Sequence, residues 1–236
     1  MSAELQEQVA LACRMIALEG YVDLTLGHVS AREPGTSTIW IKRKGPALDE
    51  VEPQDVIALD LDDPEALAVP DYHLESVMHT EVYRVRPDVG SVIHGHPLYA
   101  TALGSTDAQL RMLTHDAVLF ADGIGEFDEG PDLVTDRARG ARVAAALGER
   151  RAALLRNHGV VIAAEDVRWG VLTAVVLERA IRFQSIASTL GEPRPISDDD
   201  ADALRPQKYR EAFLDEYWAA WERRVERARV TLARNH

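Results

Sequence analysis

The chain is poor in cysteine, and its only one, Cys13, has no partner for an intrachain disulfide. Unpaired cysteine is typical of the reducing cytoplasm, so we expect a cytoplasmic protein. Cys13 falls within an apolar helical pattern between Leu5 and Ile16. That position favours a small core residue over the alternative, a catalytic thiol.

Positive charge is also scarce. The 236 residues include 26 Lys and Arg against 39 Asp and Glu, which gives a formal charge of -13. A surplus of this sign argues against nucleic acid or an anionic membrane as a partner. It does not argue against a small anionic substrate, because local cations and a metal ion determine the potential inside a site.

Long hydrophobic runs are absent as well. No segment reaches the roughly 20 apolar residues of a membrane-spanning helix, and the first residues lack the pattern of a secretory signal. The length suits one domain with a terminal appendage. We therefore predict a domain over residues 1–195 and a C-terminal helical tail over 196–236. Aromatic residues from Tyr209 to Trp221 indicate that this tail packs on the domain or on a neighbouring subunit.

The hydrophobic pattern predicts helices and strands in alternation. Helices are expected over residues 3–19, 75–85, 98–103, 133–147, 166–190 and 208–229. Strands are expected within 23–32 and over 38–41, 56–61, 91–94, 118–120, 152–155 and 160–162. A mobile loop is expected over 123–130 and a linker over 193–200. These elements predict an α/β fold, a three-layer α/β/α sandwich around a mainly antiparallel or mixed central sheet.

Three histidines and one glutamate indicate a metal site. His94 and His96 stand at i and i+2 at the end of a predicted strand, so their side chains project from one face. His158 follows another apolar strand, and Glu75 opens a predicted helix. Three imidazoles and a carboxylate suit one Zn, Mn, Fe or Co ion per subunit. The alternative is that His94 and His96 are ordinary histidines at a strand end.

Six motifs occur in an order that resembles the class II aldolase/adducin family. They are Gly27-His28-Val29-Ser30-x-Arg32, Lys44-Gly45, Glu75-x-x-x-His79-x-x-x-Tyr83, Arg86-Pro87-Asp88, His94-x-His96-Pro97 and Asn157-His158-Gly159. The match covers roughly residues 5–190. The resemblance implies an α/β/α sandwich, commonly a homotetramer with sites at subunit interfaces. It also implies that His94, His96 and His158 bind the metal, and that Glu75 both touches the metal and acts as acid and base.

The chain departs from the phosphate-cleaving members of that family. His28 stands where their G-N-x-S motif has asparagine, and Lys44 before Gly45 replaces a phosphate-binding hydroxyl. His73 stands in place of a serine ahead of the family glutamate, although Thr25 remains. A phosphate cradle needs several small donors close together, so these changes argue against a sugar phosphate.

We predict instead that His28, Lys44, Gly45, Thr25 and His73 bind a small anionic substrate, with Lys44 and His28 holding its carboxylate. The alternative for Lys44 is a solvated loop lysine, and the alternative for His28 is a residue that caps a turn.

The pattern is similar to the decarboxylase branch of the family, which acts on hydroxylated aromatic or heteroaromatic carboxylates. The resemblance therefore implies a metal-dependent carbon–carbon lyase, most simply such a decarboxylase. One alternative is a class II aldolase that cleaves a sugar (phosphate) by a retro-aldol reaction. A further alternative is a non-haem iron oxygenase on the same scaffold. An adducin-like scaffold domain without activity is disfavoured, because all four ligand positions are filled.

Two residues are the candidates for the proton donor that the reaction needs, Glu75 and, as the alternative, His115. His115 lies near the place where the aldolases have a catalytic tyrosine that reaches in from the neighbouring subunit. The alternative for His115 is a surface histidine.

Overall fold

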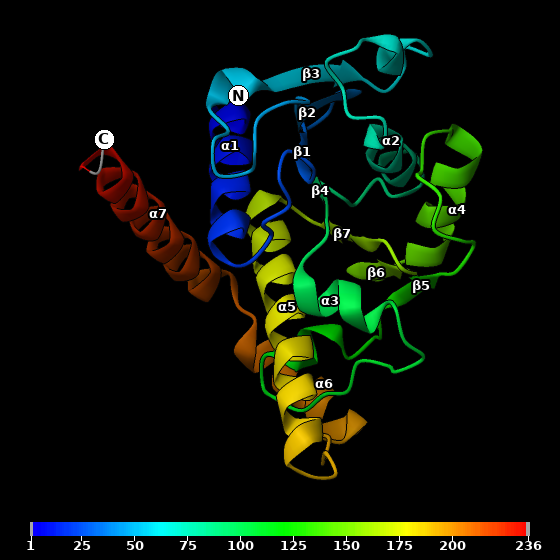
Figure 1. Cartoon of the computed structure of the whole chain (residues 1–236), viewed down its shortest axis with the longest axis vertical. Helices are drawn as coiled ribbons and strands as arrows, with labels where there is room; N and C mark the ends of the chain where they lie inside the picture. The colour runs from blue at the N-terminus through cyan, green and yellow to red at the C-terminus, as the bar shows by residue number, and fades with distance from the viewer. Residues whose placement is uncertain (1, 235–236) are drawn as a thin grey trace.

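The computed structural model describes residues 2–234, so Met1 and residues 235–236 of the predicted tail lie outside the described part. A seven-stranded sheet forms its centre, in the order β3-β2-β1-β4-β7-β6-β5 (Figure 1). The strands are β1 (His28–Arg32), β2 (Thr38–Lys42), β3 (Val56–Asp60), β4 (Ser91–Gly95), β5 (Gly125–Phe127), β6 (Ala152–Leu155) and β7 (Gly159–Ala164).

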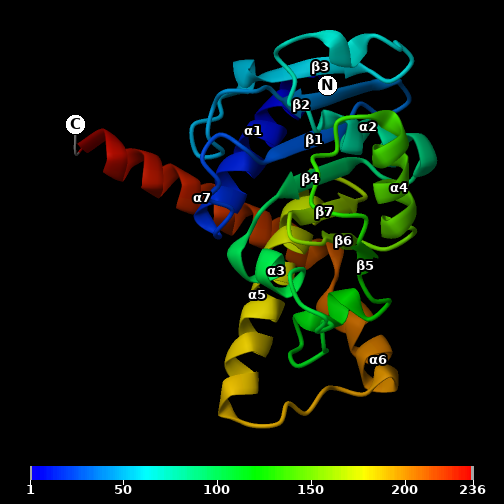
Figure 2. The same ribbon diagram turned by 45° about the vertical axis from the view of Figure 1, so that its right-hand side comes forward.

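Neighbouring strands are antiparallel, except β5 and β6, which are parallel. The predicted mixed, mainly antiparallel sheet is therefore confirmed. The short turn between Leu155 and Gly159 accounts for the antiparallel pairing of β6 with β7, as the sequence indicates. Figure 2 shows the strands stacked from β3 to β5, with β4 in the middle of the sheet.

Helices cover both faces of the sheet, as expected for an α/β/α sandwich. They are α1 (Ser2–Leu18), α2 (Ser76–Val85), α3 (Leu98–Leu103), α4 (Arg137–Leu147), α5 (Val167–Leu190), α6 (Asp198–Lys208) and α7 (Glu211–Arg234). Helices α1 and α5 pack into one apolar cluster on one face, and α2 and α4 into a second cluster on the other (Figure 1). The predicted three-layer architecture is confirmed.

The long helix α5 begins where the sequence predicts. The Asp166 side chain accepts a hydrogen bond from the Trp169 N–H at 2.9 Å, as an N-cap residue does. Val171 and Val175 lie in the apolar cluster beneath this helix. Burial of this helix face fixes α5 against β4 and β7, the two strands on which the candidate site depends.

Three local predictions are wrong, each for a physical reason. Residues Ala117–Phe120 form a 3-10 helix instead of the predicted strand. The prediction failed because a short apolar run does not by itself distinguish a strand from a helical turn. The predicted mobile loop contains β5. A Cβ at Gly125 would lie 2.2 Å from the Ala146 carbonyl oxygen, so this glycine serves close packing on α4. The predicted linker contains the start of α6, since Ser197 caps it by accepting from the Asp200 N–H at 3.1 Å.

The C-terminal helices lie on the α1 and α5 side of the molecule. Helix α7 runs beside α1 and away from the sheet (Figures 1 and 2). Trp221 and Val225 are buried there, and the Trp221 Nε1–H donates to Glu19 at 3.0 Å. The division into a domain and a tail remains a prediction. No described helix has both the length and the apolar character needed to span a membrane.

Candidate metal centre

Strand β4 carries His94 into the middle of the sheet, between β1 and β7. In the register of the sheet it lies opposite His28 on β1 and Val161 on β7. Its side chain is enclosed, and its Nδ1–H donates to the Val160 carbonyl at 2.9 Å. Because the proton is on Nδ1, the Nε2 lone pair of His94 is free to bind a cation.

His96 and His158 approach from the ends of two other segments. The His96 Nδ1–H donates to the Asp23 carboxylate, which leaves its Nε2 free as well. His158 lies in the β6–β7 turn, where Asn157 has a left-handed φ of 56°. Gly159 allows the His96 and His158 rings to approach each other, since a Cβ at residue 159 would lie 2.4 Å from the His96 ring. The two rings stack with their centroids 5.0 Å apart.

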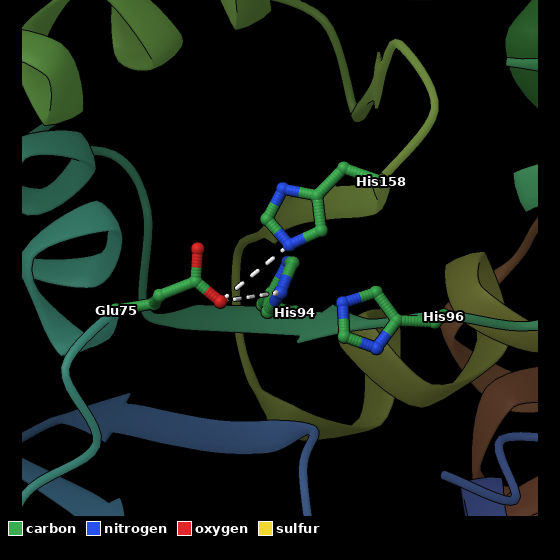
Figure 3. A group of neighbouring side chains, drawn as sticks. All are labelled: Glu75, His94, His96 and His158. Carbon is green, nitrogen blue, oxygen red and sulfur yellow. Dashed lines mark ion pairs between the residues drawn. The ribbon is translucent and has the colours of Figure 1, made fainter. Parts of the chain in front are cut away.

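Glu75 immediately precedes α2 and completes the group (Figure 3). Its Oε1 accepts a hydrogen bond from the Val134 N–H at 2.9 Å, which orients the carboxylate. Its Oε2 lies 3.7 Å from His94 Nε2 and 3.5 Å from His158 Nε2. Burial raises the pKa of Glu75, but the His158 and His94 imidazoles and the Val134 N–H outweigh it and bring the pKa to about 2. The carboxylate is therefore ionised at neutral pH.

These four side chains fit a divalent cation. His94, His96 and His158 each have a buried Nε2 with no hydrogen-bond partner among residues 2–234. One ligand atom from each histidine and one from Glu75 all lie within 4.8 Å of one another. Burying three unpaired nitrogens raises the free energy of the folded state, and a cation between them would give each nitrogen a partner. The predicted ligand set therefore meets in one place that could hold a metal ion.

The same four residues line a cavity of about 390 Å³. Its other lining residues are of two kinds. The apolar ones include Leu26, Leu74, Pro131 and Leu133. The polar ones include His28, Lys44, His73 and Asn157. A volume of this size suits a small organic molecule, which would contact the metal group, an apolar wall and several hydrogen-bonding groups together.

Comparison with known sequences places the chain in a family. The profile described as "Class II Aldolase and Adducin N-terminal domain" matches residues 7–185, more than half of the chain. The chain belongs to the class II aldolase and adducin family. The predicted resemblance is confirmed, and with it the expectation that the chain is a carbon–carbon lyase.

Proteins whose names describe several different reactions are similar to the chain. It is 31% identical over 219 residues to the 3,4-dihydroxyphthalate decarboxylase of Arthrobacter keyseri, over 86% of each chain. It is 29% identical over 239 residues to a Streptomyces roseochromogenus subsp. oscitans protein named 4-hydroxy-3-prenylphenylpyruvate oxygenase/4-hydroxy-3-prenylbenzoate synthase, over 99% of this chain and 83% of that one. Relatives named as aldolases also match.

The solved structures include an aldolase II superfamily protein from Pseudomonas syringae with the same fold. Its TM-score to this chain is 0.83 at 24% identity, and the match covers 96% of this chain and 94% of that one. At this identity the likeness concerns the fold alone.

The residues predicted to bind substrate fall into two groups. His28, Lys44 and His73 line the cavity, whereas Thr25 and Gly45 are not among its lining residues in the described part of the chain. Gly45 has a φ of 114°, a conformation that favours glycine, and so shapes the turn that follows Lys44. The roles of all five in binding remain predictions.

His115 is exposed, two residues before the 3-10 helix Ala117–Phe120. Among residues 2–234 it is not one of those that line the cavity. Its predicted role, as an acid contributed to the site of a neighbouring subunit, also remains a prediction.

Lys42 is a buried residue of the site that the sequence does not single out. Its Nζ donates to the Thr25 carbonyl at 3.2 Å and to His73 Nε2 at 3.1 Å. Burial and the charge of Lys42 lower the pKa of His73 to about 4, so the imidazole is neutral. Lys42 thereby orients the His73 ring at the cavity wall. A lysine at the end of a predicted strand resembles a solvated residue, so no local signal marks it.

Asp23, which is half-buried, is a second residue of the site that the sequence does not single out, and replacing it tests the geometry around His96. We expect Asp23→Asn to weaken zinc binding by about 10- to 100-fold, because a carboxylate that orients a metal-bound histidine has an effect of that size. Titration against a chelator of known affinity measures the change. The matched control is Asp49→Asn, at an exposed aspartate in the turn at residues 48–50. Equal zinc affinity of the two variants would show that Asp23 has no part in the site.

Proposed function

We propose that this chain is a metal-dependent decarboxylase of hydroxylated aromatic or heteroaromatic carboxylates. The observation that carries the proposal is the cavity, in which a Glu/His group that fits a metal lies together with a leucine-rich wall and the cationic side chain of Lys44. The relatives named as decarboxylases support the same reaction.

The cavity wall supports a flat apolar substrate. Leu26, Leu74 and Leu133 line it, although they are 48%, 67% and 54% exposed. An aromatic ring would cover this apolar surface, whereas the hydroxyls of a sugar would lose hydrogen bonds against it. Lys44 and His28 lie on the same cavity and would hold the carboxylate.

A bound cation would supply Lewis-acid chemistry, drawing charge from the carbon–carbon bond as it breaks. His94, His96 and His158 would hold that cation, each as a neutral imidazole through Nε2. Glu75 would take the proton of a substrate hydroxyl on Oε2, while the Val134 N–H keeps Oε1 in place. After carbon dioxide leaves, the same carboxyl would return its proton to the ring carbon, so that charge and protons balance.

Product analysis tests this proposal against the two alternative reactions, that of an aldolase and that of an oxygenase. Metal-loaded protein incubated with hydroxybenzoates or hydroxypyridine carboxylates, labelled with ¹³C at the carboxyl, should release labelled carbon dioxide. Aldehyde release from ketose phosphates, without carbon dioxide from any aromatic acid, would instead establish an aldolase. Consumption of dioxygen with ferrous iron would establish an oxygenase.

Lys44 provides a prediction about substrate binding. We expect Lys44→Ala to raise the KM for the aromatic acid about tenfold, because a hydrogen bond to a charged group is lost. Inhibition by the phenolic product, which lacks the carboxylate, serves as the control and should be unchanged. Steady-state kinetics measure both. An unchanged KM would contradict the assignment of Lys44 to the carboxylate.

We further propose zinc or manganese as the ion and a homo-oligomer, most simply a tetramer, as the active form. The ligand set supports either ion. The exposed leucines of the cavity support a neighbouring subunit close to the site, because apolar surface of this kind is commonly covered. The single buried cysteine supports a cytoplasmic location.

A further inference from the structure

Four buried side chains form a hydrogen-bonded chain that leads from the cavity into the interior. His28 Nδ1 lies 2.7 Å from His79 Nε2, and His79 Nδ1 lies 2.6 Å from Ser30 Oγ. Ser30 Oγ in turn lies 2.9 Å from the Tyr83 hydroxyl. All four residues are at most 3% exposed, so the hydrogen bonds among them decide where each proton resides.

The hydroxyl of Ser30 fixes the direction of this chain. It has one hydrogen and two partners, so it donates to one and accepts from the other. The Val92 backbone N–H beside the Tyr83 hydroxyl is a donor, so Ser30 Oγ is the only acceptor for the Tyr83 hydroxyl hydrogen within residues 2–234. Tyr83 must therefore donate to Ser30, or its buried hydrogen is left unpaired. Ser30 then donates to His79 Nδ1, and every hydroxyl hydrogen of the chain is used.

The same direction continues through the two histidines. His79 accepts at Nδ1, and burial lowers its pKa to about 3, so it is neutral and carries its proton on Nε2. That N–H donates to His28 Nδ1. A neutral His28 that accepts at Nδ1 carries its own proton on Nε2. No side chain of the described residues pairs with this N–H, and His28 lines the cavity.

We propose that Tyr83, Ser30 and His79 are positioning residues that hold His28 as a fixed hydrogen-bond donor to the substrate. Resting on the proposed function, this assigns the His28 Nε2–H to an anionic oxygen of the aromatic acid. The cavity then presents a hydrogen-bond donor at this point before any substrate binds, and this donor favours substrates that have an acceptor there. A donor that needs no reorientation on binding favours affinity, because its ordering is complete beforehand.

The proton positions can be measured without turnover. Long-range ¹H–¹⁵N correlation spectra of zinc-loaded protein labelled with ¹⁵N-histidine distinguish a protonated from a bare ring nitrogen. The His28 signals are assigned by their loss in His28→Gln. A protonated Nε2 and a bare Nδ1 in His28 support the proposal, and the reverse pattern overturns it. Because no substrate is involved, a wrong choice of substrate class leaves this test intact.

Two nearly isosteric variants test the consequence for binding. In His79→Gln the side-chain amide can still donate to His28 Nδ1, so we expect the KM for the aromatic acid to stay within about threefold. In His79→Glu an ionised carboxylate accepts a hydrogen bond from His28 Nδ1, so the proton of His28 moves from Nε2 to Nδ1. We therefore expect the KM at pH 8 to rise about tenfold or more, a larger factor than the fall in kcat. Equal KM values in the two variants would overturn the proposal.

A buried serine that does not belong to the four hydrogen-bonded side chains serves as the control for packing. Ser91→Ala, on the neighbouring strand β4, removes a hydroxyl of the same burial that donates to the Ser30 backbone carbonyl at 2.9 Å. We expect it to leave the His28 proton positions and KM as in the wild type. Ser30→Ala removes the donor to His79 Nδ1 and should shift the His28 signals. If Ser91→Ala shifts them as strongly, the effect is one of packing and the proposal fails.

Discussion

Replacing His158 with alanine is expected to remove the metal from the centre and to lower kcat/KM by about a thousandfold. A bound cation contributes several kcal/mol to the stabilisation of charge in the transition state, and about 1.4 kcal/mol corresponds to a factor of ten in rate. His94 and His96 are each anchored through Nδ1, so they can keep their places when His158 is absent. Elemental analysis of dialysed protein measures the ions retained per chain.

Thermal stability provides a second measurement of the same variant. An ion that binds only the folded chain raises Tm by mass action, so added zinc should stabilise the wild type and not His158→Ala. His115→Ala is the matched control for metal content, since His115 is exposed and is not a lining residue of the cavity in the described chain. A full equivalent of zinc retained by His158→Ala would remove His158 from the ligand set.

Short-range geometry explains why the meeting of the histidine side chains could be predicted from the sequence. Two residues that alternate at a strand end share a face, which brings His94 and His96 together before any tertiary contact is known. The turn from Asn157 to Gly159 joins the antiparallel strands β6 and β7 and places His158 beside the end of β4. Glu75 is different, because its approach depends on how α2 packs, and no short-range pattern places it beside the histidines.

The cavity wall and the buried chain behind His28 depend on contacts that no local pattern encodes. Leu26, Leu74 and Leu133 come from three separate loops, and in the sequence each resembles an ordinary apolar residue. The hydrogen bond from His79 to His28 joins residues 51 positions apart. A helix propensity or a strand period contains no information about such a pair. The tertiary arrangement was therefore needed to find it.

Replacing Glu75 with glutamine is expected to lower kcat by about 100- to 10,000-fold while the metal is retained, because general acid–base catalysis contributes an effect of that size. The substitution is nearly isosteric. The amide oxygen can still accept from the Val134 N–H at the Oε1 position, so the loop that carries Leu133 keeps its place. What is lost is Oε2, which faces the imidazoles of His94 and His158 and is the atom assigned to carry the proton.

The metal content of this variant separates catalysis from binding. Three imidazoles remain to hold the ion, so the elemental content of Glu75→Gln should match that of the wild type at saturating zinc. Glu7→Gln, at an exposed position on α1, is the control and should turn over normally. If Glu75→Gln keeps full turnover with its ion bound, the carboxylate does not transfer the proton. His115 of a neighbouring subunit would then be the remaining predicted donor, and His115→Ala would have to show the loss instead.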